Sequence, residues 1–229
     1  MLIIIDRKLP REAKERLLST GTVLELETEG LVYPAVSGHP DIFLCQTPQT
    51  LVISPSLPLR YVQYLEEHHV TFISGNKKTG IKYPSSVHYN AAVSDHYFVH
   101  RLEYTDPVLL QQCHALKKVP VKQGYTRCNL FLLRNDHYLT SDQGIHTNLQ
   151  RSGLSGIFVS PDGVLLPGFP NGFIGGAMGI LNNTVYIAGN LSHFPKGETV
   201  KNFLVALGYE IIELYEGPLF DSGGILFIQ

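Results

Sequence analysis

The chain has 229 residues, 44% of them hydrophobic, which is enough for one large or two small domains with a substantial core. Its net charge is −2 without any basic run, which argues against a nucleic-acid partner. The apolar runs are too short to cross a membrane, and residues 1–6 lack the charged region and cleavage site of a signal peptide. The three cysteines have no CxxC spacing, which is typical of free thiols in a reducing cytoplasm, and no metal-ligand cluster or phosphate-binding loop is found. We expect a cytoplasmic protein without cofactor or metal.

The chain begins with a short strand–helix–strand unit. Residues 2–5 form a β-branched run typical of a buried strand, Pro10 opens a helix that continues to about Leu18, and residues 23–26 predict a strand. A longer unit follows. Its predicted elements are strands over 42–45 and 51–53, a helix from Pro58, and a strand over 70–73.

The order strand, strand, helix, strand then returns three times. The second copy has strands at 90–93, 97–99 and 119–121 and a helix over 107–116. The third has strands at 128–133, 138–140 and 156–159 and a helix over 143–151. The fourth has strands at 175–180, 184–188 and 210–214, with a hairpin turn at 182–183 and a helix over 196–207. Asp142 and Asn190 follow equivalent second strands, where we expect helix caps.

The two ends of the chain complete a fifth unit. Residues 221–228 predict a lone strand, and the N-terminal unit lacks its leading strand. Equivalent positions (His39, Asn90, Cys128, Gly176 and Asp221) recur every 38 to 51 residues, and the step from Asp221 through the ends to His39 is 47. A steady period of this size indicates a repeat architecture, and pairing of the ends would remove exposed sheet edges. We therefore predict a single α/β domain over 1–229, closed by its terminal segments, with units near 31–80, 81–124, 125–168, 169–217, and 218–229 together with 1–30.

Five such units around an axis resemble the pentein fold, a five-bladed α/β propeller. That fold includes arginine deiminases, dimethylarginine dimethylaminohydrolase, agmatine deiminases, amidinotransferases and a non-catalytic ribosome anti-association factor. Residues 121–125, 140–142, 173–177 and 188–190 also resemble a family of uncharacterised bacterial proteins of similar size.

Several polar motifs resemble those of catalytic penteins. His39 and Asp41 form a His-x-Asp pair, and two residues apart on a strand they would share a face. The resemblance implies an acid from the preceding blade, Asp221 beside Gly223 and Gly224, and a nucleophilic cysteine two blades later, Cys128. The blade between supplies Asn90 before a strand.

The resemblance implies a thiolate that attacks the carbon of an amidine or guanidine. Protonated His39 would lower the pKa of Cys128, protonate the leaving amine and activate water, with Asp221 orienting it. Asp41 would bind the N–H groups of the small-molecule substrate. Arg127 would bind a substrate carboxylate or shield Cys128. Asn90 and Asn129 are further candidates for substrate binding.

Two departures leave alternatives open. Guanidine-modifying penteins usually carry a further Asp where this chain has Gly176, and Asp221 stands where Glu is more usual. Cys128 can be a nucleophile or a small buried hydrophobe. The sequence therefore predicts a Cys-dependent hydrolase or transferase acting on a C–N bond of an amidine- or guanidine-like molecule. The alternative is a non-catalytic pentein that binds a small molecule or the ribosome. The oligomeric state stays open.

Overall fold

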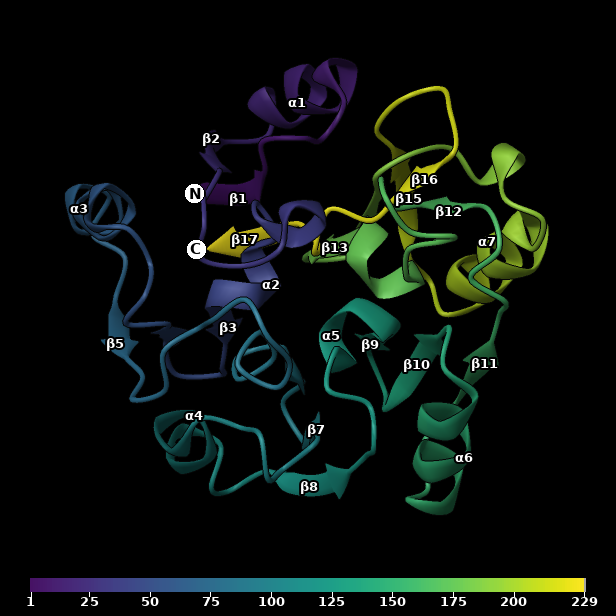
Figure 1. The fold of residues 1–229 in the computed structure, drawn as a ribbon. Coiled ribbons are helices and arrows are strands. Elements are labelled where there is room, and N and C mark those ends of the chain that lie inside the picture. The colour runs from purple at the N-terminus through teal and green to yellow at the C-terminus, as the bar shows by residue number, and fades with distance from the viewer. Residues whose placement is uncertain (229) are drawn as a thin grey trace.

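Three-stranded sheets with the same topology recur along the chain (Figure 1). The computed structural model describes residues 1–228, and within them it contains five three-stranded sheets. In each sheet the first strand runs antiparallel to the second, and the second runs parallel to the third. A helix links the second strand to the third, because parallel neighbours need a crossover connection. The predicted order of elements is thus the order found.

Each class of element recurs five times in the described residues. The first strands are β3 (Leu44–Gln46), β6 (Ala92–Val93), β9 (Leu130–Leu133), β13 (Met178–Leu181) and β17 (Leu226–Ile228). The second strands are β4 (Leu51–Ile53), β7 (Tyr97–His100), β10 (His137–Thr140), β14 (Thr184–Ile187) and β1 (Leu2–Asp6). The helices are α3 (Leu59–Glu67), α4 (Pro107–Gln112), α6 (Gln143–Arg151), α7 (Gly197–Ala206) and α1 (Arg11–Leu18). The third strands are β5 (Phe72–Ser74), β8 (Lys117–Pro120), β11 (Ser155–Phe158), β15 (Glu210–Glu213) and β2 (Thr22–Leu26).

The fifth sheet is assembled from both ends of the chain. Strand β17 pairs antiparallel with β1, with Ile3 opposite Phe227 and Ile4 opposite Leu226, and β1 pairs parallel with β2. The two termini therefore lie next to each other (Figure 1). This is the pairing that the sequence predicted.

The hydrophobic core fills the spaces between neighbouring sheets. One cluster joins Leu24 of the terminal sheet to Ile53 and Leu65 of the next unit. Another joins Leu139 of β10 to Val185 of β14. Because each sheet packs against the next, the first strands face a common centre, and the segments leading into them meet there (Figure 1).

The first strands start later than predicted. Short helical turns precede three of them: α2 (Pro40–Phe43), α5 (Thr126–Asn129) and η2 (Ile174–Ala177). His39 caps α2 and Asp41 lies inside it, so the expectation that both share a strand face is wrong. The reason is Pro40, whose fixed φ suits the first position of a helix as well as the start of a strand.

A few elements lie outside the repeated design. These are η1 (Pro34–Val36), η3 (Leu191–His193) and the parallel pair β12 (Val164–Leu165) and β16 (Leu219–Phe220). The predicted caps are confirmed: Asp142 accepts from the backbone N–H of Ile145, and Asn190 accepts from that of Ser192. Within residues 1–228, no helix has the length and apolarity that crossing a membrane requires.

Candidate active site

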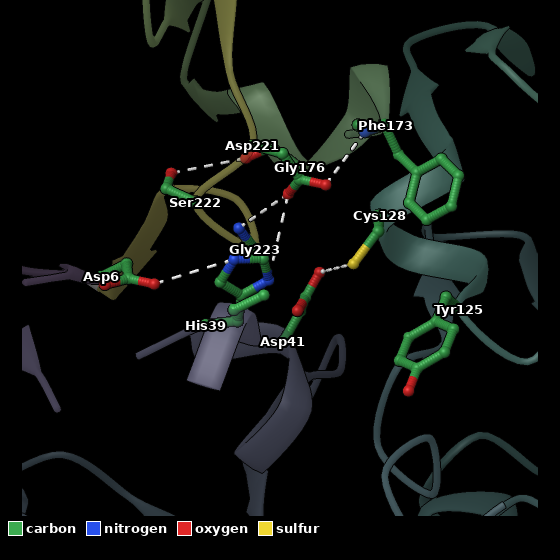
Figure 2. A network of polar contacts seen from close by, with 12 residues as sticks. Asp6, His39, Asp41, Tyr125, Cys128, Phe173, Gly176, Asp221, Ser222 and Gly223 are labelled. Carbon is green, nitrogen blue, oxygen red and sulfur yellow. Dashed lines mark hydrogen bonds and ion pairs between the residues drawn. The ribbon is translucent and has the colours of Figure 1, made fainter. Parts of the chain in front are cut away.

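The thiol of Cys128 and the carboxyl of Asp41 point toward each other (Figure 2). Cys128 Sγ donates a hydrogen bond to Asp41 Oδ2 at 2.9 Å, although the two residues are 87 positions apart. Each residue is only 2% exposed. The turns α5 and α2 thus bring two of the predicted site residues into direct contact.

Asn90 holds both turns in place from the segment before β6. Its Oδ1 accepts hydrogen bonds from the backbone N–H of Arg127 at 2.8 Å and of Cys128 at 3.3 Å. Its Nδ2 donates to the carbonyl of Asp41 at 3.2 Å and lies 3.3 Å from Cys128 Sγ. Two of these four contacts are with Cys128 itself and two are with its neighbours in the turns, so the amide holds the thiol beside Asp41.

His39 completes the cluster from the start of α2. One ligand atom each from His39, Asp41 and Cys128 lies within 4.8 Å of the others, so this trio could hold a metal ion as well as perform acid–base chemistry. The imidazole lies between two carboxyls: its Nδ1 is 3.9 Å from Asp221 Oδ1, and its Nε2 is 3.7 Å from Asp6 Oδ2. Within residues 1–228 neither ring nitrogen has a hydrogen-bond partner.

Asp221 is anchored by backbone groups on both sides. Its Oδ2 accepts from the N–H of Phe173 at 2.9 Å, and its Oδ1 accepts from the N–H of Gly223 at 3.1 Å. A Cβ on Gly176 would lie 1.8 Å from Asp221 Oδ1, and one on Gly223, where φ is +68°, would lie 2.3 Å from His39 Cβ. The glycines are therefore needed for the close approach of this loop to the cluster.

The remaining predicted residues make mostly structural contacts. Arg127 donates from Nη1 to the carbonyl of Gly175 at 2.7 Å and from Nη2 to that of Met178 at 3.2 Å, which ties α5 to η2 and β13. Asn129 Nδ2 donates to the carbonyl of Tyr125 at 2.8 Å. Of the seven predicted residues, His39, Asp41, Asn90, Cys128 and Asp221 come together, whereas the side chains of Arg127 and Asn129 bind backbone groups beside them.

Three residues next to the cluster were not predicted as part of it (Figure 2). Asp6 ends β1 and reaches His39 from the side opposite Cys128, while Tyr125 and Phe173 lie beside Cys128. Tyr125 hydroxyl bonds the hydroxyl of Ser86 at 2.6 Å. In the sequence, the only feature that could have pointed to Asp6 as a site residue is its position as an acid directly after the apolar run of residues 2–5.

Burial controls the protonation of the cluster. It raises the pKa of Asp41 and of Asp6 to about 6, and together with the charge of Asp41 it raises that of Asp221 to about 7. Burial lowers the pKa of His39 to about 3. Burial and then the charge of Asp41 raise the pKa of Cys128 well above its ordinary value. The folded cluster thus holds a thiol and a neutral imidazole, whereas the sequence led us to expect a cationic His39 that lowers the pKa of the thiol.

A small cavity lies between the first strands and reaches the cluster from one side. Its volume is about 160 Å³, and it is lined by Asp41 and Arg127 together with residues of all five first strands, Gln46 and Phe227 among them. His39 and Cys128 are not part of its lining. Asp41 therefore faces both the thiol and this cavity.

Comparison with known proteins places the chain among pentein folds. An amidinotransferase of the saxitoxin biosynthetic pathway from Microseira wollei has a TM-score of 0.59 at 10% identity, covering 100% of this chain and 94% of that one. A mutant of dimethylarginine dimethylaminohydrolase (DDAH) from Pseudomonas aeruginosa, complexed with citrulline, has a TM-score of 0.54 at 11% identity, covering 97% and 92%. An agmatine deiminase from C. jejuni has a TM-score of 0.50 at 9% identity, covering 89% and 73%.

These similarities confirm the predicted resemblance to penteins at the level of the fold. No curated protein matches the sequence. A family model described as "Family of unknown function (DUF6873)" matches residues 4–226.

Proposed function

The chain belongs to this DUF6873 family, and from its site we propose a cysteine-dependent hydrolase or transferase that cleaves a C–N bond of an amidine- or guanidine-like small molecule. The observation that carries the proposal is the convergence of a thiol, an imidazole and a carboxyl within 4.8 Å at the centre of the fold. These are a nucleophile, a proton-transfer group and a binding group for a planar cation. The similar folds of amidine- and guanidine-acting enzymes agree with this type of reaction.

A cationic substrate would activate the cluster. The pKa of Cys128 is raised by burial and by nearby carboxylates, and a positive charge among these groups acts in the opposite direction. An amidinium that donates N–H bonds to Asp41 takes the place of the thiol as donor to that carboxylate. The thiol proton then passes to His39, and a thiolate forms only when the substrate is present.

The first half of the reaction forms an S–C bond. Cys128 Sγ attacks the amidinium carbon, and the C=N electron pair moves to nitrogen to give a tetrahedral adduct. His39 returns its proton to the leaving nitrogen, the C–N bond breaks, and the amine departs. A cationic thioimidate on Cys128 remains.

The second half releases the thiol. Water, or an amine acceptor, loses a proton to His39 as it adds to the thioimidate carbon. The S–C bond then breaks and Cys128 recovers the proton from His39. When water is the acceptor, the added oxygen also loses its second proton, which passes to the solvent. With water the product is an amide or urea, and with an amine the amidine group is transferred.

A binding protein without catalysis is the second candidate. The observation that favours it is the fully buried, protonated thiol, which would remain inert if no ligand altered its surroundings. The test below separates the two candidates.

We also propose that the five sheets are blades of one closed propeller, with boundaries near 31–80, 81–124, 125–168, 169–217, and 218–229 with 1–30. The shared topology of the sheets and the pairing of β17 with β1 support this, and Gln229 lies outside the described residues.

We further propose a cytoplasmic location, which is supported by the three free thiols of Cys45, Cys113 and Cys128.

The test uses two electrophiles of the same shape, the cation 2-chloroacetamidine and the neutral 2-chloroacetamide. We expect the amidine to alkylate Cys128 at least about tenfold faster at pH 7.5, because Asp41 and Asp221 attract its charge. The amide should react slowly at pH 7.5 and faster at each higher pH up to 9, because the raised pKa of Cys128 keeps the thiol mostly protonated over this whole range and the small thiolate fraction grows with pH. Peptide mapping by mass spectrometry identifies the alkylated cysteine, with Cys45 and Cys113 as internal references.

Turnover decides between enzyme and binding protein. The protein is incubated with arginine, methylated arginines, agmatine and simple amidines, and released amine and any mass adduct on Cys128 are measured. We expect the wild type to release amine from at least one of these compounds and Cys128→Ala to release none. Equal alkylation of the three cysteines by both electrophiles, with no release, would sink the enzymatic proposal. Tight retention of one of these compounds by both proteins without release would support the binding role.

A further inference from the structure

Asp6 is a buried acid with one oxygen unused. It is 1% exposed, and its Oδ1 accepts a hydrogen bond from the backbone N–H of Lys8 at 2.7 Å. Its Oδ2 has no hydrogen-bond partner within residues 1–228 and lies 3.7 Å from His39 Nε2. A buried carboxylate oxygen without a donor is costly, so an acid kept in this position calls for a specific partner.

The carboxyl of Asp221, which faces Nδ1 of His39, already has hydrogen-bond donors on both oxygens. Both oxygens of Asp221 accept backbone N–H groups, from Phe173 and Gly223. Asp41 Oδ1 also lacks a hydrogen-bond donor, but its carboxyl lies on the Cys128 side of the ring. On the opposite side, Asp6 Oδ2 is the free side-chain acceptor within the described part of the chain. Its carboxyl is also confined, because a Cβ on Gly38 would lie only 2.3 Å from Asp6 Oδ1.

We propose that Asp6 is a positioning residue: it accepts the Nε2 proton of His39 and thereby keeps Nδ1 unprotonated for proton transfer with Cys128. In Figure 2 the nitrogen that faces Asp6 lies on the side of the ring away from Cys128. The distance from His39 Nε2 to Asp6 Oδ2 is 3.7 Å and must shorten to about 2.8–3.0 Å for a hydrogen bond. Hydrogen bonds between catalytic groups are often long in enzymes without a bound ligand and shorten when the substrate binds. This inference rests on the function proposed above, but its main test does not require turnover.

Other charged groups also face the imidazole. Asp41 and Asp221 lie on the side of the reacting groups, and Lys8 lowers the pKa of His39 through its charge. Because burial raises the pKa of Asp6 to about 6, its carboxyl is ionised above that pH and able to accept the Nε2 proton. The positioning should therefore weaken as the pH falls below about 6.

The variant Asp6→Asn gives a sharp test. The oxygen of the substituted amide would stay on the N–H of Lys8, so the amide nitrogen would face His39 and could only donate. The imidazole would then have to carry its proton on Nδ1. Nitrogen-15 NMR of histidine-labelled protein at pH 7.5 reports the tautomer, and the His39 signals are assigned by their loss in His39→Gln.

We expect Nε2–H in the wild type and Nδ1–H in Asp6→Asn. Asp142→Asn, which alters a helix cap far from the imidazole in sequence, should keep the wild-type tautomer. If His39 of the wild type carries its proton on Nδ1, the proposal is overturned. This measurement uses the wild type alone, so it does not depend on whether the variant folds. An Nε2–H tautomer that persists in folded Asp6→Asn would also overturn the proposal, and a reversal in Asp221→Asn would assign the role to Asp221.

Once a substrate has been identified, steady-state kinetics give a second test of the role of Asp6. We expect Asp6→Asn to lower kcat by about 100-fold or more, in the range seen when a histidine takes the wrong tautomer, with KM changed by less than about threefold. A large rise in KM with unchanged kcat would contradict a positioning role. If the wild type shows no turnover, the proposed function fails while the tautomer result still decides the role of Asp6.

Discussion

A single glycine changes how the site residues are interpreted. From the sequence, Gly176 stands where guanidine-modifying penteins carry an acid, which argued against a cationic substrate. In the structure, the carboxyl of Asp221 occupies the space beside Gly176, with Oδ1 only 1.8 Å from where a Cβ would be. The negative charge can therefore be supplied from another segment, and the glycine is compatible with a cationic substrate.

This crowding predicts a strong effect of one methyl group. Gly176→Ala should lower the free energy of unfolding by about 1–3 kcal/mol, because the methyl must displace Asp221 or the loop that carries it. Gly144→Ala is the matched control. It lies in α6 with only Asp142 Oδ1 nearby, at 3.1 Å, so the gain in helix propensity should leave stability equal or higher. Urea unfolding of both variants checks the contrast, and equal losses would contradict the packing argument.

At the scale of the element, sequence patterns located the strands but not the turns that carry the site. Apolar runs between turn residues identify the strands, because burial and turn geometry are local properties. The turns α2 and α5 are four residues long, and their helical shape depends on contacts with distant segments such as that of Asn90. His39, Asp41 and Cys128 could be singled out by the resemblance to penteins. Asp6 could not, since an acid after a strand is equally typical of a turn.

Asn90 offers a test of how α5 is held. Asn90→Ala leaves the backbone N–H of Arg127 without its shorter side-chain acceptor and should cost about 1–3 kcal/mol of stability. Asn90→Asp keeps the acceptor but replaces the amide near Cys128 with a carboxyl, which raises the pKa of the thiol further. We expect Asn90→Asp to unfold nearer the wild type but to react more slowly with 2-chloroacetamide at pH 8.5. Thermal unfolding and alkylation rates measure the two effects, and faster alkylation of Asn90→Asp would contradict this account.

At the scale of the whole molecule, the site exists because distant segments share one centre. Asp6 and Asp221 belong to the terminal sheet and the segment that leads into it, whereas His39, Asn90 and Cys128 precede the first strands of three other sheets. The order of these sheets, with both ends of the chain in one sheet, brings the five residues together (Figure 1). The repeat of units and the incomplete ends made this order predictable from the sequence. The distances within the cluster were not, because they depend on how five independent sheets pack.

The pairing of β1 with β17 allows a test of ring closure. Because Leu2 lies opposite Ile228, a short Gly/Ser linker from residue 229 to residue 1 should form a hairpin, and new ends can be opened at the exposed Gly168 between two units. We expect this circular permutant to unfold cooperatively with a Tm within about 5 °C of the wild type. Deletion of 225–229 should instead abolish cooperative unfolding, because Ile225 and Phe227 pack in one core cluster and Leu226 and Ile228 in another. Calorimetry compares the proteins, and a stable deletion variant with an unfolded permutant would show that the ends do not close the ring.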